Sequence, residues 1–143
     1  MKALLQRVCH ASVRVDGMAI GEINQGILVF LGIETGDHQG LCQTMAYKIA
    51  HYRLFSDGQR MNQNVQQIQG GVLLVSQFTL AADTQKGLRP GFSKAAPPAT
   101  ALPLYQQVGQ ALAEFVPVQY GQFGADMQVS LVNDGPVTFM LNV

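Results

Sequence analysis

The residues that could do chemistry gather at the end of one apolar run. Val72–Val75 follows two glycines, and Ser76, Gln77 and Thr79 then surround Phe78 before any turn residue occurs. Hydroxyl and amide side chains at the end of a rigid strand can orient a substrate or stabilise an oxyanion, and Thr79 is a candidate nucleophile. The same side chains can also satisfy backbone groups at a strand end, so this stretch by itself supports both interpretations.

The stretch lacks the partners that common catalytic sites use. A hydroxyl becomes a good nucleophile when a base takes its proton, and the sequence around Thr79 offers no such base. There is no Ser-His-Asp or Cys-His pairing, no GxGxxG and no GxxxxGK[ST], and His10, His38 and His51 show no metal-ligand spacing. Chemistry here would rely on backbone donors or on a group that the substrate brings.

A long loop follows this stretch. Residues 81–94 are rich in Gly and Pro and carry three cations, Lys86, Arg89 and Lys94, against one acid. Long loops without secondary structure are often functional, so we expect a lid or a binding wall in which Lys86 and Arg89 contact an anion. A solvated surface loop is the alternative interpretation.

Strands must position these residues. The β-branched apolar run Val72–Val75 predicts a central strand that is buried on both faces. Alternation over Ala3–Val15 predicts a long half-buried strand, and Asp16-Gly17 predicts a hairpin into Met18–Ile23. A further turn leads into Ile27–Ile33, so we expect the chain to open with a three-stranded meander.

Helices are expected to cover the sheet, and the tail returns to strands. Apolar residues recur at helical spacing through His38–Arg53, with Asp37 as the N-cap, and a second helix begins at Pro97-Pro98. Near the C-terminus, Asn133-Asp134-Gly135-Pro136 is expected to form a tight connection between two strands, and a plain hairpin turn is one interpretation of it. The strands expected in the tail are Val118–Tyr120, Met127–Val132 and Val137–Val143.

The composition limits the size, partners and location of the protein. A chain of 143 residues suits one domain, and its 48% hydrophobic against 13% charged residues favours a homo-oligomer that covers apolar surface. Zero net charge argues against a clamp for a long nucleic-acid duplex and leaves local contacts only. Two cysteines without CxxC spacing, no signal-peptide pattern and no apolar run of membrane length predict a cytoplasmic protein.

Two motifs in order make the sequence recognisable. Ser76–Leu80 and Asn133–Thr138, with Lys86–Pro90 between them, resemble the D-aminoacyl-tRNA deacylases, the D-tyrosyl-tRNA deacylase family. The likeness runs from Arg7-Val8 to the C-terminus and covers essentially the full chain. Gln59-Arg60 departs from the Gly-Lys that the family more often shows, which affects only a local loop contact.

The resemblance implies a fold, an assembly and an activity. The fold is α/β: a single domain over residues 1–143 with three α/β/β layers, a barrel-like β core and two main helices. The assembly is a cytoplasmic homodimer in which Ser76–Leu80 of one subunit faces Gly135-Pro136 of the other. The activity is hydrolysis of the ester that joins a D-amino acid, or glycine mischarged on alanine tRNA, to the terminal ribose of tRNA. No metal, no other cofactor and no membrane partner is implied.

The implied site residues come from both motifs and from the loop between them. The catalytic set is Ser76, Gln77, Phe78 and Thr79, and the substrate-binding set is Gly135, Pro136, Lys86, Arg89 and Met127. The Gly135-Pro136 bond is implied to be cis and to reject L-aminoacyl-tRNA through its backbone. Thr79 is either a true nucleophile or a pocket residue beside backbone amides and the 2′-OH of the substrate. A non-catalytic binder of tRNA ends is the alternative function.

Overall fold

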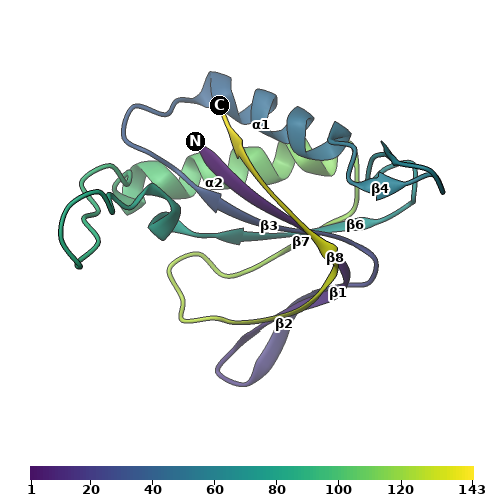
Figure 1. Cartoon of the computed structure of the whole chain (residues 1–143). Coiled ribbons are helices and arrows are strands. Elements are labelled where there is room, and N and C mark those ends of the chain that lie inside the picture. Colours follow the sequence, from purple (N-terminus) through teal and green to yellow (C-terminus); the bar gives the residue numbers. More distant parts are fainter.

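Strand β6 (Gly71–Ser76) is an interior strand of the sheet in the computed structural model, which describes residues 1–143 (Figure 1). Val72–Val75 is buried because other layers cover both faces of the sheet. Strand β6 pairs in parallel with β3 (Gly26–Gly32) on one edge and with β7 (Val118–Tyr120) on the other. The expected central strand is confirmed.

Strand β1 (Lys2–Val15) is long enough to hold three partners. Its first half pairs antiparallel with β3, its second half pairs with β2 (Met18–Ile23), and β8 (Gln128–Asn142) runs antiparallel along nearly its whole length. Because β2 and β3 occupy different halves of β1, the sheet order is β2-β1-β3-β6-β7. The expected meander is therefore wrong: the turn before β3 carries the chain along β1 instead of back along β2.

The burial of β1 side chains changes phase along the strand. Leu5 packs in the larger core cluster, whereas Val13, at a position of the same parity, packs in the smaller one. The register between β1 and β8 is irregular between Val8 and His10, and a slip of one residue there moves the following side chains to the other face. One strand therefore contributes to two cores, which gives the expected α/β/β layering.

The sheet nearly closes on itself. Strands β2 and β7 stand at the two ends of its order, yet a Cβ added to Gly21 of β2 would lie 2.7 Å from the carbonyl oxygen of Tyr120 in β7. Only glycine permits such a close backbone approach, so this position brings the two ends together. The result is the expected barrel-like β core of a mixed α/β domain.

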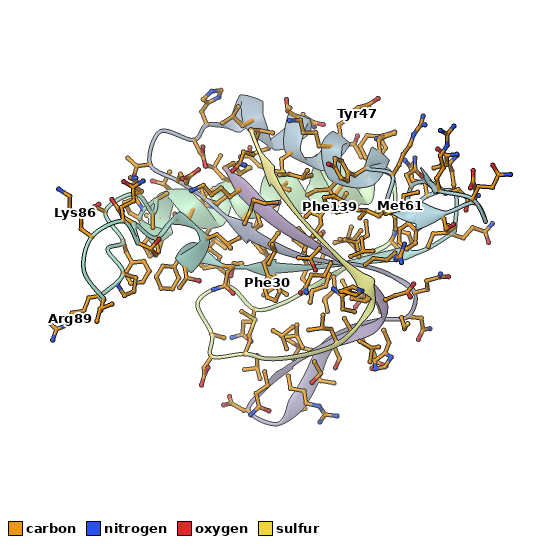
Figure 2. All side chains as sticks on the ribbon, viewed as in Figure 1. Phe30, Tyr47, Met61, Lys86, Arg89 and Phe139 are labelled. Atoms are coloured by element: carbon orange, nitrogen blue, oxygen red, sulfur yellow. The ribbon has the colours of Figure 1, made fainter.

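Two helices cover one face of this sheet (Figure 1). Helix α1 (Gln39–His51) and helix α2 (Pro98–Ala113) pack against each other and bury apolar side chains toward the sheet. Leu104 and Leu112 of α2 are buried, as their helical spacing predicted. Tyr47 of α1 points away from the sheet (Figure 2). No helix has the length and apolar character that crossing a bilayer requires.

Two smaller elements matter for the sites described below. Strands β4 (Phe55–Ser56) and β5 (Met61–Gln63) form a separate two-stranded hairpin after α1. The 3-10 helix η1 (Phe78–Ala81) follows β6 directly, so the polar strand end turns into a short helical turn instead of leaving as a loop.

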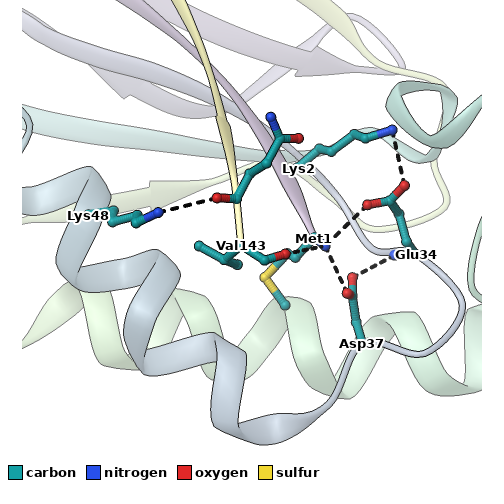
Figure 3. Close-up of polar contacts among 7 residues, drawn as sticks. Met1, Lys2, Glu34, Asp37, Lys48 and Val143 are labelled. Carbon is teal, nitrogen blue, oxygen red and sulfur yellow. Dashed lines mark hydrogen bonds and ion pairs between the residues drawn. The ribbon is translucent and has the colours of Figure 1, made fainter.

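The amino terminus is held inside the fold. The α-ammonium group of Met1 donates to Asp37 Oδ1 at 2.8 Å, to Glu34 Oε2 at 3.2 Å and to the carbonyl oxygen of Val143 at 3.2 Å (Figure 3). Asp37 also accepts from the backbone N–H of Glu34, so the expectation that Asp37 caps α1 is wrong, and His38 precedes the helix without a side-chain cap. The ammonium group carries a full positive charge, whereas a helix N-terminus carries only about half of one, which favours the ammonium group as the partner of this carboxylate.

Of the three strands expected in the tail, the first is β7, and the other two are joined in the single strand β8. Val8 of β1 stands opposite Asn133, and Gln6 stands opposite Thr138, so a single residue of β1 is matched by residues 134–137 of β8. The extra residues bulge out of the ladder. The expected tight connection is therefore a bulge inside a continuous strand, because β1 continues to pair with β8 on both sides of it.

Replacing Gly21 with alanine should destabilise the fold. The new methyl group would press on the Tyr120 carbonyl, a backbone group that cannot swing away, so we expect the free energy of unfolding to fall by about 1–3 kcal/mol. Urea unfolding followed by circular dichroism measures this loss. Gly91→Ala is the matched control, because its Cβ would stay 3.9 Å from the nearest atoms. Equal stability of the two variants would contradict the close approach of β2 and β7.

Removing the Glu34 carboxylate should change how stability depends on pH. Burial raises the pKa of Glu34, but hydrogen bonds and charge from Lys2 and the α-ammonium group outweigh burial and hold this pKa below its usual value of 4.5. Ionised Glu34 therefore stabilises the fold above about pH 4.5, and this contribution disappears as the pH falls through the lowered value. We expect Glu34→Gln to melt below the wild type at neutral pH and to approach it as the pH falls below the lowered pKa of Glu34.

Thermal melts across this pH range measure the difference between the two proteins. Glu22→Gln is the control, because Glu22 is exposed and forms no ion pair. A deficit for Glu34→Gln that stays constant at every pH would show that the ion pairs with Glu34 contribute nothing.

Candidate functional site

A cavity of about 630 Å³ opens where β6 ends. Ser76, Gln77 and Phe78 form one side of it, and most of its other lining side chains are apolar. This volume and this lining are typical of pockets that enclose a whole small molecule. The other walls include side chains from β3, the loop before α2, α2 itself and the segment between β7 and β8: Phe30, Phe92, Tyr105, Phe123 and Met127.

Tyr105 gives the cavity an aromatic wall with its polar group already engaged. Its side chain is buried, and its hydroxyl donates to the carbonyl oxygen of Leu74 at 2.8 Å. Burial raises the pKa of Tyr105 well above its usual value, so the phenol stays protonated and cannot act as a base. The ring centroids of Tyr105 and Phe123 lie 5.9 Å apart, which offers flat apolar surface to an aromatic ligand.

Gln77 and Thr79 form a linked pair beside the cavity. The amide nitrogen of Gln77 donates to the hydroxyl oxygen of Thr79 at 2.6 Å. An amide nitrogen cannot accept the hydroxyl proton in return, and no carboxylate, imidazole or amine bonds to Thr79. Thr79 therefore has no side-chain base in contact, as its sequence surroundings indicated, and it adjoins the cavity without lining it.

The loop over residues 81–94 forms a wall of the cavity at its base and a cationic tip at its far end. Phe92 lines the cavity and its ring centroid lies 5.0 Å from that of Phe78. The backbone of Asp83 exchanges two hydrogen bonds with Gly91, and these close the loop into a compact excursion. Lys86 and Arg89 project from its tip, away from the cavity (Figure 2).

The bulge in β8 is held by two side chains that were not among the expected site residues. Arg7 Nε donates to the carbonyl oxygen of Asp134 at 2.8 Å, and Arg7 Nη1 donates to the carbonyl oxygen of Leu54 at 2.7 Å. Asn133 Oδ1 accepts from the backbone N–H of Val137 at 2.8 Å, which closes the bulge from its other side. The segment between these anchors is exposed although both of its ends are fixed.

Gly135 and Pro136 form the exposed part of this bulge, which we call the β8 bulge (residues 134–137). The peptide bond between them is cis, which confirms that expectation. Gly135 has φ +156°, and a Cβ there would lie 2.5 Å from the backbone nitrogen of Val137, so no other residue fits without a shift.

The structure brings some of the expected site residues together and leaves others apart. Ser76, Gln77, Phe78 and Met127 line the cavity. Gly135, Pro136, Lys86 and Arg89 do not line the cavity of their own chain.

Sequence reasoning missed the aromatic walls and the two anchors of the β8 bulge. Arg7 left a weak signal, because a cation on a half-buried strand needs partners. Phe30 and Phe123 left none, because they come from separate elements that only the fold brings together.

Comparisons with known proteins cover the whole chain. A family model described as D-Tyr-tRNA(Tyr) deacylase matches residues 4–142. D-aminoacyl-tRNA deacylases from Haemophilus influenzae strain PittGG and from Saccharophagus degradans are 60% and 59% identical, each over 100% of both chains. The D-aminoacyl-tRNA deacylase of Actinobacillus pleuropneumoniae serotype 5b is 56% identical over the same share.

Solved structures share the fold. A c-Myc DNA unwinding element binding protein superposes with a TM-score of 0.96 at 40% identity, over 100% of this chain and 99% of that one. A probable eukaryotic D-amino acid tRNA deacylase superposes with a TM-score of 0.85 at 14% identity, which speaks for the fold alone. The match of the family model to residues 4–142 and the full-length identities of up to 60% with the curated relatives lead to one conclusion: the chain belongs to the D-Tyr-tRNA(Tyr) deacylase family, whose members are hydrolases.

Proposed function

We propose that this protein hydrolyses the ester between a D-amino acid and the terminal ribose of tRNA, releasing free tRNA and the D-amino acid. Membership of the family supports the reaction class. The observation that carries the proposal is the cavity at the end of β6, in which Ser76 and Gln77 stand beside aromatic walls. A terminal adenosine can stack on such walls, and its ester would then reach the polar strand end.

The chemistry needs little from the protein beyond positioning. Water attacks the ester carbonyl, the bond to the ribose oxygen breaks, and that oxygen takes a proton as it leaves. The substrate brings a 2′-OH beside the reacting ester, and a group held that close can assist a reaction that lacks a protein base. In this mechanism Thr79, which has no base in contact, does not react; it adjoins the site, and Gln77 holds its hydroxyl group in place. Activation of Thr79 as a nucleophile is the alternative that the test below distinguishes.

The proposed enzyme is a cytoplasmic homodimer. Large apolar side chains on β2 and β8 are left exposed, among them Met18 at 71%, Val132 at 46% and Met140 at 46%. A second copy of the chain is the occupant that best fits them, because it would also bring the β8 bulge of one subunit to the cavity of the other. This arrangement accounts for a firmly anchored bulge that has no role in its own cavity.

The β8 bulge is proposed to enforce chirality. Backbone carbonyls of Gly135 and Pro136, presented to the partner's cavity, would accept from the α-amino group of a D-residue. An L-residue held by the same amino and ester groups would drive its side chain into those carbonyls. Glycine has no side chain to clash, so glycine mischarged on alanine tRNA would also be hydrolysed. Rejection by backbone suits an enzyme that accepts many D side chains, because a side-chain pocket would also select by size.

The direct test uses purified protein and D-tyrosyl-tRNA. Release of D-tyrosine, with L-tyrosyl-tRNA spared, is the expected result. Tight binding of the tRNA without release would instead identify a non-catalytic binder of tRNA ends.

Thr79→Ala should keep substantial activity. No base contacts the Thr79 hydroxyl, and the substrate brings its own 2′-OH, so the methyl and hydroxyl groups of Thr79 are expected only to shape the site. Single-turnover rates on D-tyrosyl-tRNA measure this. A substrate that ends in 2′-deoxyadenosine should react far more slowly with both proteins. An inactive Thr79→Ala enzyme, together with full wild-type activity on the deoxy substrate, would establish Thr79 as the nucleophile.

Arg89→Ala should weaken the contact with the tRNA end. Arg89 and Lys86 are exposed at the tip of a loop whose base forms a wall of the cavity, where they can reach phosphates of the single-stranded terminus. We expect KM to rise and the slope of log affinity against log salt to shrink by about 0.7. Turnover of a D-aminoacyl-adenosine without phosphates should not change. Arg14→Ala, an exposed arginine on β1, is the control, and an unchanged salt slope for Arg89→Ala would make this loop an ordinary solvated surface.

A further inference from the structure

Six cations have no carboxylate partner, and four of them fall into two pairs at separate places on this molecule; the other two, Arg14 and Lys48, donate to backbone carbonyl groups. Of the nine lysines and arginines, Lys2, Arg7 and Lys94 form ion pairs with carboxylates. Lys86 and Arg89 occupy the tip of the loop beside the cavity, and Figure 2 shows this tip at the opposite end of the molecule from Met61. The β4–β5 hairpin, which contains Met61, carries the second group.

Arg53 and Arg60 form this second group, which we call the hairpin patch. Arg53 stands two residues before β4, at the open end of the hairpin, and Arg60 stands directly before β5, at its turn, so the two arginines mark the two ends of one short hairpin. Both are exposed, and neither side chain donates to any group of the protein. Two guanidinium groups with all their donors free are suited to phosphate, which arginine binds through a planar pair of N–H groups.

The single acid on this hairpin is turned toward its own backbone. Asp57 accepts from the amide nitrogen of Asn62 at 2.6 Å and from the backbone N–H groups of Gln59 and Arg60 at 3.0 and 3.1 Å. These bonds fix the shape of the hairpin and the backbone position of Arg60. The Asp57 carboxylate is thus used inside the loop and forms no ion pair with either arginine.

The hairpin patch is coupled mechanically to the β8 bulge. Arg7 donates to the carbonyl oxygen of Leu54, next to Arg53, and also to the carbonyl oxygen of Asp134, next to Gly135. One guanidinium group therefore holds the base of the hairpin against the base of the bulge. The ring of Tyr52, on the other side of Arg53, packs edge-on against Phe139 of β8 with centroids 5.5 Å apart. The hairpin patch and the β8 bulge therefore keep a fixed position relative to each other.

We infer that the hairpin patch binds phosphates of the tRNA acceptor stem while the 3′ end of that tRNA lies in the cavity of the other subunit. This inference rests on the proposed function, in which the β8 bulge of one subunit reaches the cavity of its partner. Because the hairpin is anchored to the bulge, the patch would then lie beside the partner's cavity, which has its own Lys86 and Arg89 on the loop that forms one of its walls. Each active site is thus bordered by cations from both subunits, although the whole chain has zero net charge.

The stem is the expected occupant because the bulge separates the hairpin from the cavity. The single-stranded end of tRNA must pass the bulge before its nucleotides reach the patch, and the part beyond that end is base-paired. Contacts to phosphates position a nucleic acid without reading its sequence, which suits an enzyme that serves many tRNAs. They should also make the affinity depend on salt, with each arginine–phosphate pair adding about one to the slope.

The first experiment compares substrates of increasing length. The Arg53→Gln/Arg60→Gln variant should show a kcat/KM about tenfold lower, and a smaller salt slope, on D-tyrosyl-tRNA. It should match the wild type on D-tyrosyl-adenosine and on a D-tyrosyl-CCA trinucleotide, neither of which has a stem. Arg14→Gln is the matched control, because Arg14 is an exposed arginine far along β1 from the hairpin. Equal losses on all three substrates, or no loss on tRNA, would overturn the inference.

The second experiment tests which subunit supplies the patch. Gly135→Ala subunits should lack a working bulge, because the new Cβ would meet Val137. Ala125→Trp subunits should have a filled cavity, because Ala125 lines it. A dimer that contains one subunit of each kind keeps one working site, made from the cavity of the first subunit and the bulge of the second, and random mixing should restore about a quarter of wild-type activity.

Arg53→Gln/Arg60→Gln is then added to one partner at a time. On the Ala125→Trp subunit, which donates the bulge, the double change should lower kcat/KM for tRNA about tenfold, as in the first experiment. On the Gly135→Ala subunit, which donates the cavity, it should have no effect. The reverse pattern, or equal effects, would overturn the inference while leaving the activity itself intact. Failure to restore any activity by mixing would overturn both the shared site and the patch that depends on it.

Discussion

The contacts of the Arg7 guanidinium group are the interaction on which the proposed specificity depends. This group is 14% exposed and bonds to backbone carbonyls on both sides of it, those of Leu54 and Asp134. Hydrogen bonds of charged groups contribute about 1.5–3 kcal/mol each, so these contacts hold the β8 bulge and the β4–β5 hairpin in one rigid unit. Together with Asn133 they keep an exposed backbone segment in a single shape. A segment that rejects a substrate by its backbone needs this rigidity, because a mobile segment would yield to the wrong enantiomer.

The fold explains how this unit and the cavity can come from one small sheet. Strand β1 binds β8 along its length and changes the face that it buries between Val8 and His10, next to the irregular pairing that frees the bulge. Strand β6 lies two places further along the sheet, buried on both faces, and carries Ser76 at its end. The bulge and the cavity are therefore fixed by the same sheet at different places. In the proposed homodimer, the bulge of one subunit and the cavity of the other would form one site between two rigid parts.

Local patterns in the sequence correctly predicted the elements that depend mainly on residues close to them along the chain. The apolar run of β6, the Asp16-Gly17 hairpin and the buried stripe of α2 appear where alternation and spacing placed them. The polar residues Ser76 and Gln77, with Phe78, were also found from the sequence, because polar groups at the end of a buried strand are unusual there.

Features that depend on distant partners were missed. The local sequence favours Asp37 as a helix cap, but the Asp37 carboxylate instead binds the α-ammonium group of Met1, which lies 36 positions away along the chain. Asn133 to Pro136 has the composition of a turn and was therefore expected to separate two strands. Nothing in the neighbouring sequence indicates that β1 pairs with β8 on both sides of it. Arg7 lies 127 positions from the carbonyl group of Asp134 that it holds. Contacts between residues so far apart produce no repeating sequence pattern in either of the two segments, so the sequence alone does not predict them.

The preference of the Asn133→Ala variant for D- over L-aminoacyl-tRNA shows whether the β8 bulge enforces chirality. This change removes the bonds that close the bulge at Val137 and Thr138 while leaving the cavity and its lining unchanged. The ratio of kcat/KM for D-tyrosyl-tRNA to that for L-tyrosyl-tRNA is compared with the wild type, with circular dichroism as the check on folding. If the bulge backbone enforces chirality, the ratio should fall by at least tenfold, through slower D-hydrolysis and measurable L-hydrolysis. A folded Asn133→Ala enzyme with an unchanged ratio would show that the bulge backbone does not enforce chirality.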